Sequence, residues 1–331
     1  MPISGSTPWM EGAYVKSASA PDTLPQSLPT DLDRRLKTAV RSVVSVPDDV
    51  LDPILIAFLA GGHVLIEGIP GTGKTLLSRT LARCFDCDFK RIQFTNDLMP
   101  SDIVGSSVWR PGEERFEFVR GPLFANVVLA DELNRTSSRT MSCMLEAMEE
   151  GHVSVEGESI ALADPFLILA TRNPIEFHGT FPIPEAVLDR FLARVELGYP
   201  TAESERGLYC GEDPSASLTA LEPILDGNTL SSLRAAVPHV VVSEAVAEYT
   251  FRVVDATRTH DGVALGVSPR AAMSWLRSAK ARALVEGRDY VVPDDLKALA
   301  EPLLGHRVFL KGGGDARAFV AEILSSVHVE L

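Results

Sequence analysis

The sequence predicts an α/β fold: a parallel five-stranded sheet with helices on both faces, followed by a smaller all-helical domain. Apolar segments of strand length alternate with segments of helical period up to about residue 200, which is typical of a parallel α/β sheet. The strand pattern fades after Pro200, and 331 residues exceed the ~100–200 that one domain usually holds. We therefore expect a core over residues 31–200 and a helical domain over 201–331. The five expected strands are residues 63–66, 91–94, 127–130, 166–170 and 194–197.

The remaining segments have their own patterns. Residues 1–30 are rich in Ser, Pro and Ala without a hydrophobic period, which predicts a disordered tail. The clearest helix precedes Gly151, a plausible end point, because apolar residues recur there at helical spacing. Further helices are expected over 270–285 and 294–304. The residues with helical spacing are Met141, Met144, Leu145 and Met148.

Two segments interrupt the alternation and predict β-hairpins. Residues 101–120 place apolar pairs on either side of Pro111-Gly112, a turn dipeptide. Residues 152–162 alternate apolar and polar side chains around Glu156-Gly157. Trp109 and Phe116 in the first hairpin either contact a partner or pack their own hairpin against the core, and we favour the contact.

Composition narrows the possible functions. The net charge of -14 argues against a protein that grips nucleic acid through a broad basic surface, because phosphate neutralisation supplies most of such affinity. Four cysteines are too few for a disulfide scaffold, so we expect a reducing, cytoplasmic location. No segment has the pattern of a signal peptide, and none approaches the ~20 apolar residues of a membrane helix.

One segment predicts a phosphate-binding loop. Residues 68–75 read GIPGTGKT, fit the pattern G-x-x-x-x-G-K-[ST], and lie between an apolar strand and a helical stretch. Glycines let the backbone N–H groups wrap an anion, and the following helix N-terminus adds partial positive charge. Lys74 is expected to reach the outer phosphates, and the Thr75 hydroxyl to bind Mg²⁺. The expected phosphate-binding residues are Gly68, Pro70, Gly71, Thr72, Gly73, Lys74, Thr75 and Leu76.

Polar residues follow two of the expected strands. Asp131 and Glu132 come directly after the strand 127–130, at a position where α/β sheets present ligand groups. We expect Asp131 to hold Mg²⁺ and Glu132 to orient and deprotonate the attacking water. Asn173 follows the strand 166–170, from which it could reach the γ-phosphate or the water. Taken alone, the two acids or the asparagine could be ordinary loop residues, so these assignments depend on the phosphate loop.

Together these motifs resemble the MoxR family of AAA+ ATPases over residues 35–320. Besides the loop, the segments that carry the resemblance are 100–105 (PSDIVG), 121–124 (GPLF), 131–135 (DELNR), 170–174 (ATRNP), 181–191 (FPIPEAVLDRF), 268–270 (SPR) and 305–307 (GHR). One departure is 44–48 (VSVPD), where the family usually has a Gly-Gln pair near the adenine, so recognition of the base stays open.

The resemblance implies an AAA+ core with a helical lid, ATP and Mg²⁺ as ligands, and nucleotide bound between core and lid at the interfaces of a hexameric ring. Asn173 matches sensor 1, Arg190 matches the arginine finger with Arg194 as runner-up, and Arg270 matches sensor 2, which reaches the phosphates from the lid. His306 and Arg307 either touch nucleotide or pack the lid. The two hairpins match the helix-2 insert and the presensor-1 insert.

The function that the resemblance implies is ATP-driven remodelling, maturation or activation of a client protein complex. Family members are thought to insert metals or cofactors, often with a partner protein that carries a von Willebrand factor A domain. Two alternatives stay open: a nucleic-acid-stimulated motor, which the acidic balance disfavours, and a nucleotide-gated switch, for which a water-activating acid is unnecessary. The client is not encoded in any motif.

Overall fold

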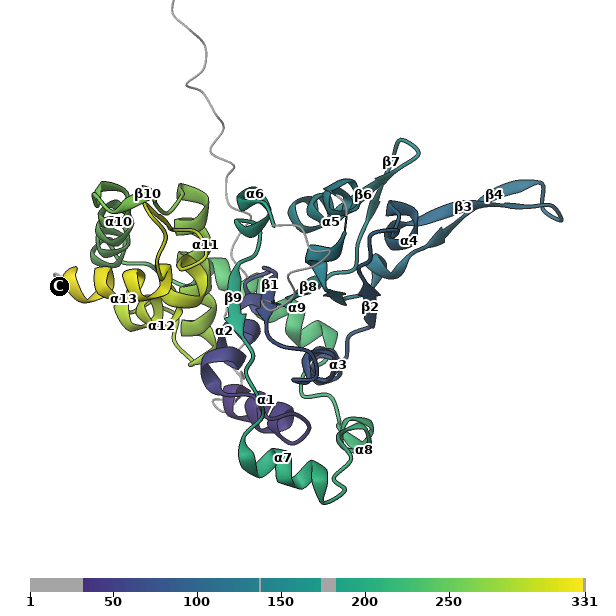
Figure 1. Cartoon of the computed structure of the whole chain (residues 1–331), viewed down its shortest axis with the longest axis horizontal. Coiled ribbons are helices and arrows are strands. Elements are labelled where there is room, and N and C mark those ends of the chain that lie inside the picture. Colours follow the sequence, from purple (N-terminus) through teal and green to yellow (C-terminus); the bar gives the residue numbers. More distant parts are fainter. Residues whose placement is uncertain (1–31, 137, 174–182, 330–331) are drawn as a thin grey trace, which may run out of the picture.

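The computed structural model describes residues 32–136, 138–173 and 183–329. Its centre is a parallel five-stranded sheet in the order β2-β5-β8-β1-β9 (Figure 1). All five predicted strands are confirmed, with bounds that differ by one or two residues. The strands are β1 (Val64–Glu67), β2 (Phe89–Gln93), β5 (Val127–Asp131), β8 (Leu167–Arg172) and β9 (Ala193–Glu196).

The three central strands, β5, β8 and β1, are buried on both faces, which explains their nearly continuous apolar sequences. Successive residues of β1 point to opposite faces, so Val64 and Ile66 join one hydrophobic cluster and Leu65 joins the other. The first face is covered by α1 (Leu32–Arg41), α2 (Asp48–Leu59) and α3 (Lys74–Cys84). The second is covered by α4 (Pro100–Val104) and α5 (Ser138–Glu150).

Helix α5 is the helix expected from the methionine spacing. Met141 and Met144 are buried in the second cluster, and Met148 packs against it. Gly151 follows the helix with φ +66°, a left-handed conformation that glycine adopts at helix ends without steric cost. The predicted helix and its end are therefore confirmed.

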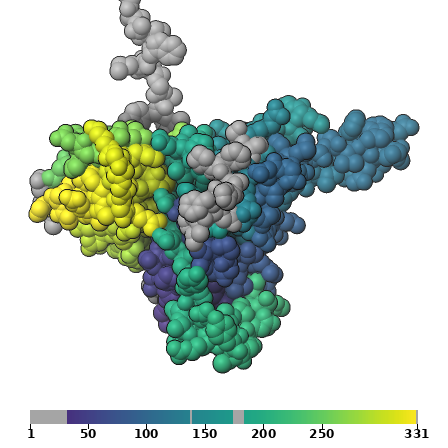
Figure 2. All heavy atoms as spheres, in the orientation of Figure 1, coloured from purple at the N-terminus to yellow at the C-terminus, as the bar shows by residue number. Residues whose placement is uncertain are grey.

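Both hairpins are present. The first consists of β3 (Gly105–Arg110) and β4 (Arg115–Arg120), and the second of β6 (His152–Val155) and β7 (Glu158–Ala161). The first begins later than predicted, because residues 100–104 form helix α4, with Pro100 at its first position. It projects far from the body of the molecule (Figures 1 and 2).

The chain after residue 200 is mainly helical, in α7 (Ala202–Tyr209), α8 (Pro214–Ala220), α9 (Gly227–Ala236), α10 (Glu244–Thr259), α11 (Pro269–Val285), α12 (Pro293–Leu304) and α13 (Ala316–Ser326). The expectation of an all-helical lid needs one correction: β10 (Val263–Leu265) and β11 (Phe309–Leu310) pair as a small antiparallel sheet. Strands this short show no period in the sequence. Nowhere in the described ranges is a helix long and apolar enough to cross a bilayer.

The lid and the core share one hydrophobic cluster. Buried residues of α11 and α12 belong to the same cluster as those of α2 and β9. Helices α8 and α9 lie against α3 and α2 of the core, and the backbone N–H groups of Ile224 and Leu225 both donate to the Cys84 carbonyl. The lid is thus docked against the β9 edge of the sheet, and this docking decides where the lid arginines lie.

Candidate nucleotide site

The sheet order brings the predicted phosphate and acid residues together. Strands β2, β5, β8 and β1 are neighbours and parallel, so their carboxyl ends meet at one edge of the sheet. A cavity of about 410 Å³ opens at that edge. It is lined by Pro70, Gly71, Gly73, Lys74, Thr75, Leu76, Arg91, Gln93, Asp131, Glu132, Thr171 and Asn173.

The loop between β1 and α3 has the backbone that a phosphate cradle requires. Gly71 and Gly73 have φ of +85° and +90°, values that L side chains rarely adopt. A Cβ on Gly68 would lie 2.4 Å from the Leu197 carbonyl oxygen, so only glycine fits against β9 there. Thr72 Oγ1 donates to the Ile69 carbonyl at 3.0 Å. Gly68 and Thr72 therefore shape the loop from outside the cavity.

Lys74 lies at the start of α3 with its ammonium group folded onto the loop. Nζ donates to the carbonyls of Gly68 at 2.7 Å and Ile69 at 2.8 Å. Burial lowers the Lys74 pKa, while the nearby carboxylates of Asp131 and Glu132 oppose this shift. The helix N-terminus adds partial positive charge at the same point. The loop is thus built for an anion.

Asp131 is buried at the tip of β5. Its Oδ1 accepts a hydrogen bond from Thr171 Oγ1 at 2.5 Å, and its Oδ2 pairs with the Arg91 guanidinium at 2.5 Å. The Thr75 hydroxyl lines the same cavity. Mg²⁺ prefers oxygen ligands and takes only one or two from protein at nucleotide sites, so this donor pair fits the ion.

Glu132 stands next to Asp131 in a left-handed conformation, φ 59° and ψ 48°. Such a backbone is uncommon for a residue other than glycine, and it is held here by a 2.9 Å hydrogen bond from the Glu132 N–H to Thr171 Oγ1. The carboxylate accepts a hydrogen bond from Gln93 Nε2 at 2.8 Å and lies 3.4 Å from the Arg135 guanidinium. Thr171 therefore organises both acids.

Two residues of this site had no sequence motif, and a third, Thr171, lay within the segment 170–174 but had no assigned role. Arg91 and Gln93 alternate along β2 with the buried Ile92, and Thr171 precedes the predicted Asn173. The signal that could have found the first two is a pair of polar side chains at i and i+2 at the carboxyl end of a strand, on either side of a buried residue. Asn173 itself is buried and lines the cavity, as predicted.

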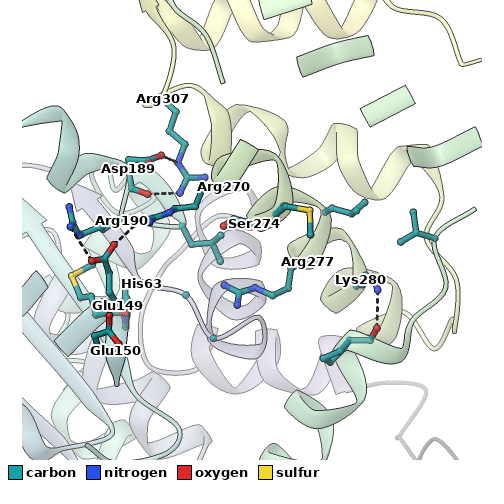
Figure 3. A pocket seen from close by; sticks show the side chains of 18 residues that line it. His63, Glu149, Glu150, Asp189, Arg190, Arg270, Ser274, Arg277, Lys280 and Arg307 are labelled. Atoms are coloured by element: carbon teal, nitrogen blue, oxygen red, sulfur yellow. Dashed lines mark hydrogen bonds and ion pairs between the residues drawn. The ribbon is translucent and has the colours of Figure 1, made fainter. Parts of the chain in front are cut away.

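Arg190 and Arg270 lie elsewhere. They line a larger cavity, of about 790 Å³, between the core and the lid (Figure 3). Glu149 at the end of α5 binds both: its carboxylate is 3.0 Å from Arg190 and 2.6 Å from Arg270. Burial opposes ionisation of Glu149, but the two arginines hold its pKa below the ordinary value.

The two cavities are at opposite edges of the sheet. His63, just before β1, lines the arginine cavity, whereas the phosphate loop follows β1, and four strand residues span about 13 Å. Within one chain, no described residue of the lid lines the phosphate cavity, and Arg270 lines the other one. The cause is the docking of the lid against β9 and α2.

The other candidate arginines have packing contacts. Arg194 on β9 pairs with Glu67 at 2.6 Å, beside the loop. Arg307 is buried and donates to the carbonyls of Asp189 and Phe191, and His306 also contacts the Phe191 carbonyl, at 2.9 Å. Of the two alternatives for His306 and Arg307, the geometry favours packing of the lid against the core.

Comparisons with known proteins agree with this architecture. The family model described as "ATPase family associated with various cellular activities (AAA)" matches residues 63–193, and the model described as "AAA lid domain" matches residues 255–325. A crystal structure of a proposed ATPase from Cytophaga hutchinsonii superimposes with a TM-score of 0.82 at 35% identity, over 91% of this chain and 96% of that one. Fold and site thus define an AAA+ ATPase, an enzyme that hydrolyses ATP.

Its relatives place it more narrowly. Chaperone MoxR1 of Mycobacterium tuberculosis is 40% identical, over 82% of this chain and 74% of that protein. Protein MoxR of Paracoccus denitrificans is 32% identical, over 86% and 90%. The uncharacterised protein YeaC of Bacillus subtilis is 46% identical, over 83% and 88%. The chain belongs to the MoxR family of AAA+ ATPases.

Proposed function

We propose that the chain is a Mg²⁺-dependent ATPase whose residues divide the chemistry between two subunits. In the phosphate cavity, the loop and Lys74 bind the phosphates, and Glu132 takes the proton of the attacking water. Thr75 and Asp131 would hold Mg²⁺, which when bound neutralises charge on the phosphate oxygens. Asn173 would orient the water or the γ-phosphate from the neighbouring strand tip.

The separation of the two cavities supports a site shared between subunits. A phosphoryl group in transfer spreads negative charge that arginines stabilise, yet Arg190 and Arg270 lie at the sheet edge opposite the loop. In a ring, one subunit's arginine cavity can face the next subunit's phosphate cavity. This separation carries our proposal of a ring oligomer, which we expect to be a hexamer, with Arg190 as finger and Arg270 as lid arginine.

Mixing two inactive variants tests the shared site. Arg190→Ala should bind ATP nearly normally but hydrolyse it poorly, and Lys74→Ala should lose ATP binding. Mixed rings should recover part of the activity, because a Lys74→Ala subunit still offers Arg190 to the intact phosphate cavity of its neighbour. Rings that mix Lys74→Ala with Glu132→Gln are the control, because both substitutions damage the phosphate cavity and leave Arg190 intact in every subunit.

The control mixture should stay inactive, because every phosphate cavity in it carries a lesion. If verified mixed rings of the first pair were equally inactive at all ratios, the finger would lie elsewhere, with Arg194 the next candidate, or catalysis would occur within one subunit.

We further propose that ATP turnover remodels or activates a client protein, as the name of the mycobacterial chaperone suggests for that relative. The projecting β3–β4 hairpin, with exposed aromatic side chains, supports a client contact. A partner with a von Willebrand factor A domain and a role in metal or cofactor insertion belong to the same proposal. Co-purification from the native cell, with Glu132→Gln as the trapping variant, tests both.

A further inference from the structure

The cavity between core and lid carries a local surplus of positive charge. The chain as a whole has a net charge of -14. Three acids line the cavity, Glu149, Glu150 and Asp189, whereas its lining includes five cationic side chains. The cations are Arg190, Arg270, Arg277, Lys280 and Arg307.

Four of these cations already have partners. Arg190 and Arg270 share Glu149, Arg307 pairs with Asp189 at 3.2 Å, and the Lys280 ammonium donates to the Pro238 carbonyl at 2.8 Å. Arg277 differs: within residues 32–136, 138–173 and 183–329, its guanidinium makes neither a hydrogen bond nor an ion pair. Figure 3 shows it extending from α11 into the cavity, toward the side where Glu149 and Glu150 lie.

The surroundings of Arg277 leave its positive charge available to an anion. Arg277 is exposed on the cavity wall, and partial burial together with the neighbouring positive charge of Arg234 lowers its pKa. An anion that enters the cavity can therefore pair with this guanidinium without displacing a partner among the described residues. His63 also lines the cavity but adds no charge near neutral pH, because burial lowers its pKa to about 4.

The position of Arg277 suits a ligand that Arg270 also contacts. The two arginines are seven residues apart on α11, about two turns or 10 Å along one helix face. Glu149 shows that side chains from core and lid converge on one anionic group here. Guanidinium groups bind phosphate oxygens in a bidentate manner, and the cavity volume of about 790 Å³ accommodates a chain of phosphates.

We propose that this cavity binds phosphate groups and that Arg277 is a phosphate contact within it. The phosphates have two possible sources: a free polyphosphate or nucleotide, or the nucleotide held by a neighbouring subunit. The second source depends on the ring described under Proposed function, and the first does not.

The first arm of the test measures a free anion. Lys74→Ala protein, whose phosphate loop is disabled, is titrated with tripolyphosphate in a thermal-shift assay. Tripolyphosphate should raise the melting temperature saturably. If a second substitution, Arg277→Ala, abolishes this rise and Arg35→Ala does not, the free source is established. Arg35 is a suitable charge-matched control because it is exposed on α1, outside the cavity.

The second arm measures hydrolysis by assembled protein. Arg277→Ala should lower kcat about tenfold or more with little change in the KM for ATP, the usual effect of losing a hydrogen bond to a charged group that forms in the transition state. Mixing with Lys74→Ala subunits, which still carry Arg277, should restore part of the activity and so establish the neighbour as the source.

Arg277→Lys keeps the charge and separates phosphate binding from packing. It should retain part of the tripolyphosphate stabilisation in the first arm, or part of kcat in the second, whichever Arg277→Ala reduces. Arg277→Ala behaviour equal to that of Arg35→Ala in both arms overturns the proposal. The proposal is also overturned if Arg277→Ala melts earlier or assembles poorly but leaves the response to anions unchanged. That outcome is expected if Arg277 only packs the lid or pairs with an acid of a neighbouring subunit. Arg190→Ala distinguishes the failures, because normal hydrolysis by that variant instead overturns the shared site.

Discussion

The first hairpin offers a direct test of whether its aromatic side chains serve stability or contact. Trp109 and Phe116 are paired across the two strands, with ring centroids 5.1 Å apart in an edge arrangement. Their exposed fractions are 47% and 69%, and neither belongs to the hydrophobic clusters of the core. The rings therefore pack on each other near the turn of the hairpin, and this hairpin projects from the body of the molecule (Figure 2).

These exposures set the size of the expected effect of Trp109→Ala. Truncating a fully buried tryptophan costs about 3–5 kcal/mol. Trp109 already keeps almost half of its surface exposed, and the aromatic pair adds only ~0.5–1.5 kcal/mol. We expect a loss of about 1–2 kcal/mol, confined to the hairpin, which can open locally while the core stays folded. The main melting transition should move by no more than about 4 °C.

Trp275→Ala is the matched control, because it makes the same substitution in the core. Trp275 is fully buried, and its Nε1 donates to the Leu296 carbonyl at 2.9 Å. Melting curves of both variants, together with basal ATP hydrolysis, separate the two roles. Trp109→Ala should keep basal hydrolysis within about twofold while weakening capture of a reduced and alkylated unfolded protein used as client probe. A melting shift as large as that of Trp275→Ala, with client capture intact, would refute the contact interpretation.

Three further outcomes are expected. Glu132→Gln should bind ATP but hydrolyse it about 10²–10⁴-fold more slowly, because only the base is removed. Equilibrium binding and single-turnover assays measure these two effects, and wild-type turnover would contradict the assignment. Gly68→Ala should weaken ATP binding and cost roughly 1–3 kcal/mol, since its Cβ would meet the Leu197 carbonyl at 2.4 Å; ATP titrations and melting curves check this. His63 has a folded-state pKa of about 4, below its ordinary 6.5, so the unfolded chain binds more protons between these values and stability is lost as pH falls through them. Urea unfolding should show about 2 kcal/mol of this loss between pH 7 and pH 5, absent in His63→Gln.

The central strands of the sheet were predictable because they are buried on both faces, which leaves uninterrupted apolar runs such as that of β5. Helix α5 was predictable because its apolar residues recur at helical spacing. The small sheet of β10 and β11 was missed, since a strand of two or three residues carries no period. Periodicity also gives the apolar face of a helix but not the element it packs against, so the contact of α8 with α3 had no signal.

The phosphate cavity was predictable for a related reason. Parallel strands end at one edge, so residues that follow apolar strands converge there, as Asp131 and Asn173 do. Arg91 was missed because polar residues on an exposed edge strand belong to no motif. The separation of Arg270 from the phosphate loop of its own chain was not predictable, because it depends on how the lid docks against β9 and α2, which local sequence patterns do not encode.

Helix α5 connects the parts of the proposed machine. It begins a few residues after Glu132 in the phosphate cavity, runs for 13 residues or about 20 Å, and ends with Glu149 in the arginine cavity. Hairpin β6–β7 follows it directly, and α4, which leads into hairpin β3–β4, packs against it. A change at either cavity that moves α5 therefore moves the supports of both hairpins together. Because a packed helix transmits displacement as a rigid body rather than absorbing it, α5 is the structural element through which we expect ATP turnover to reach a client.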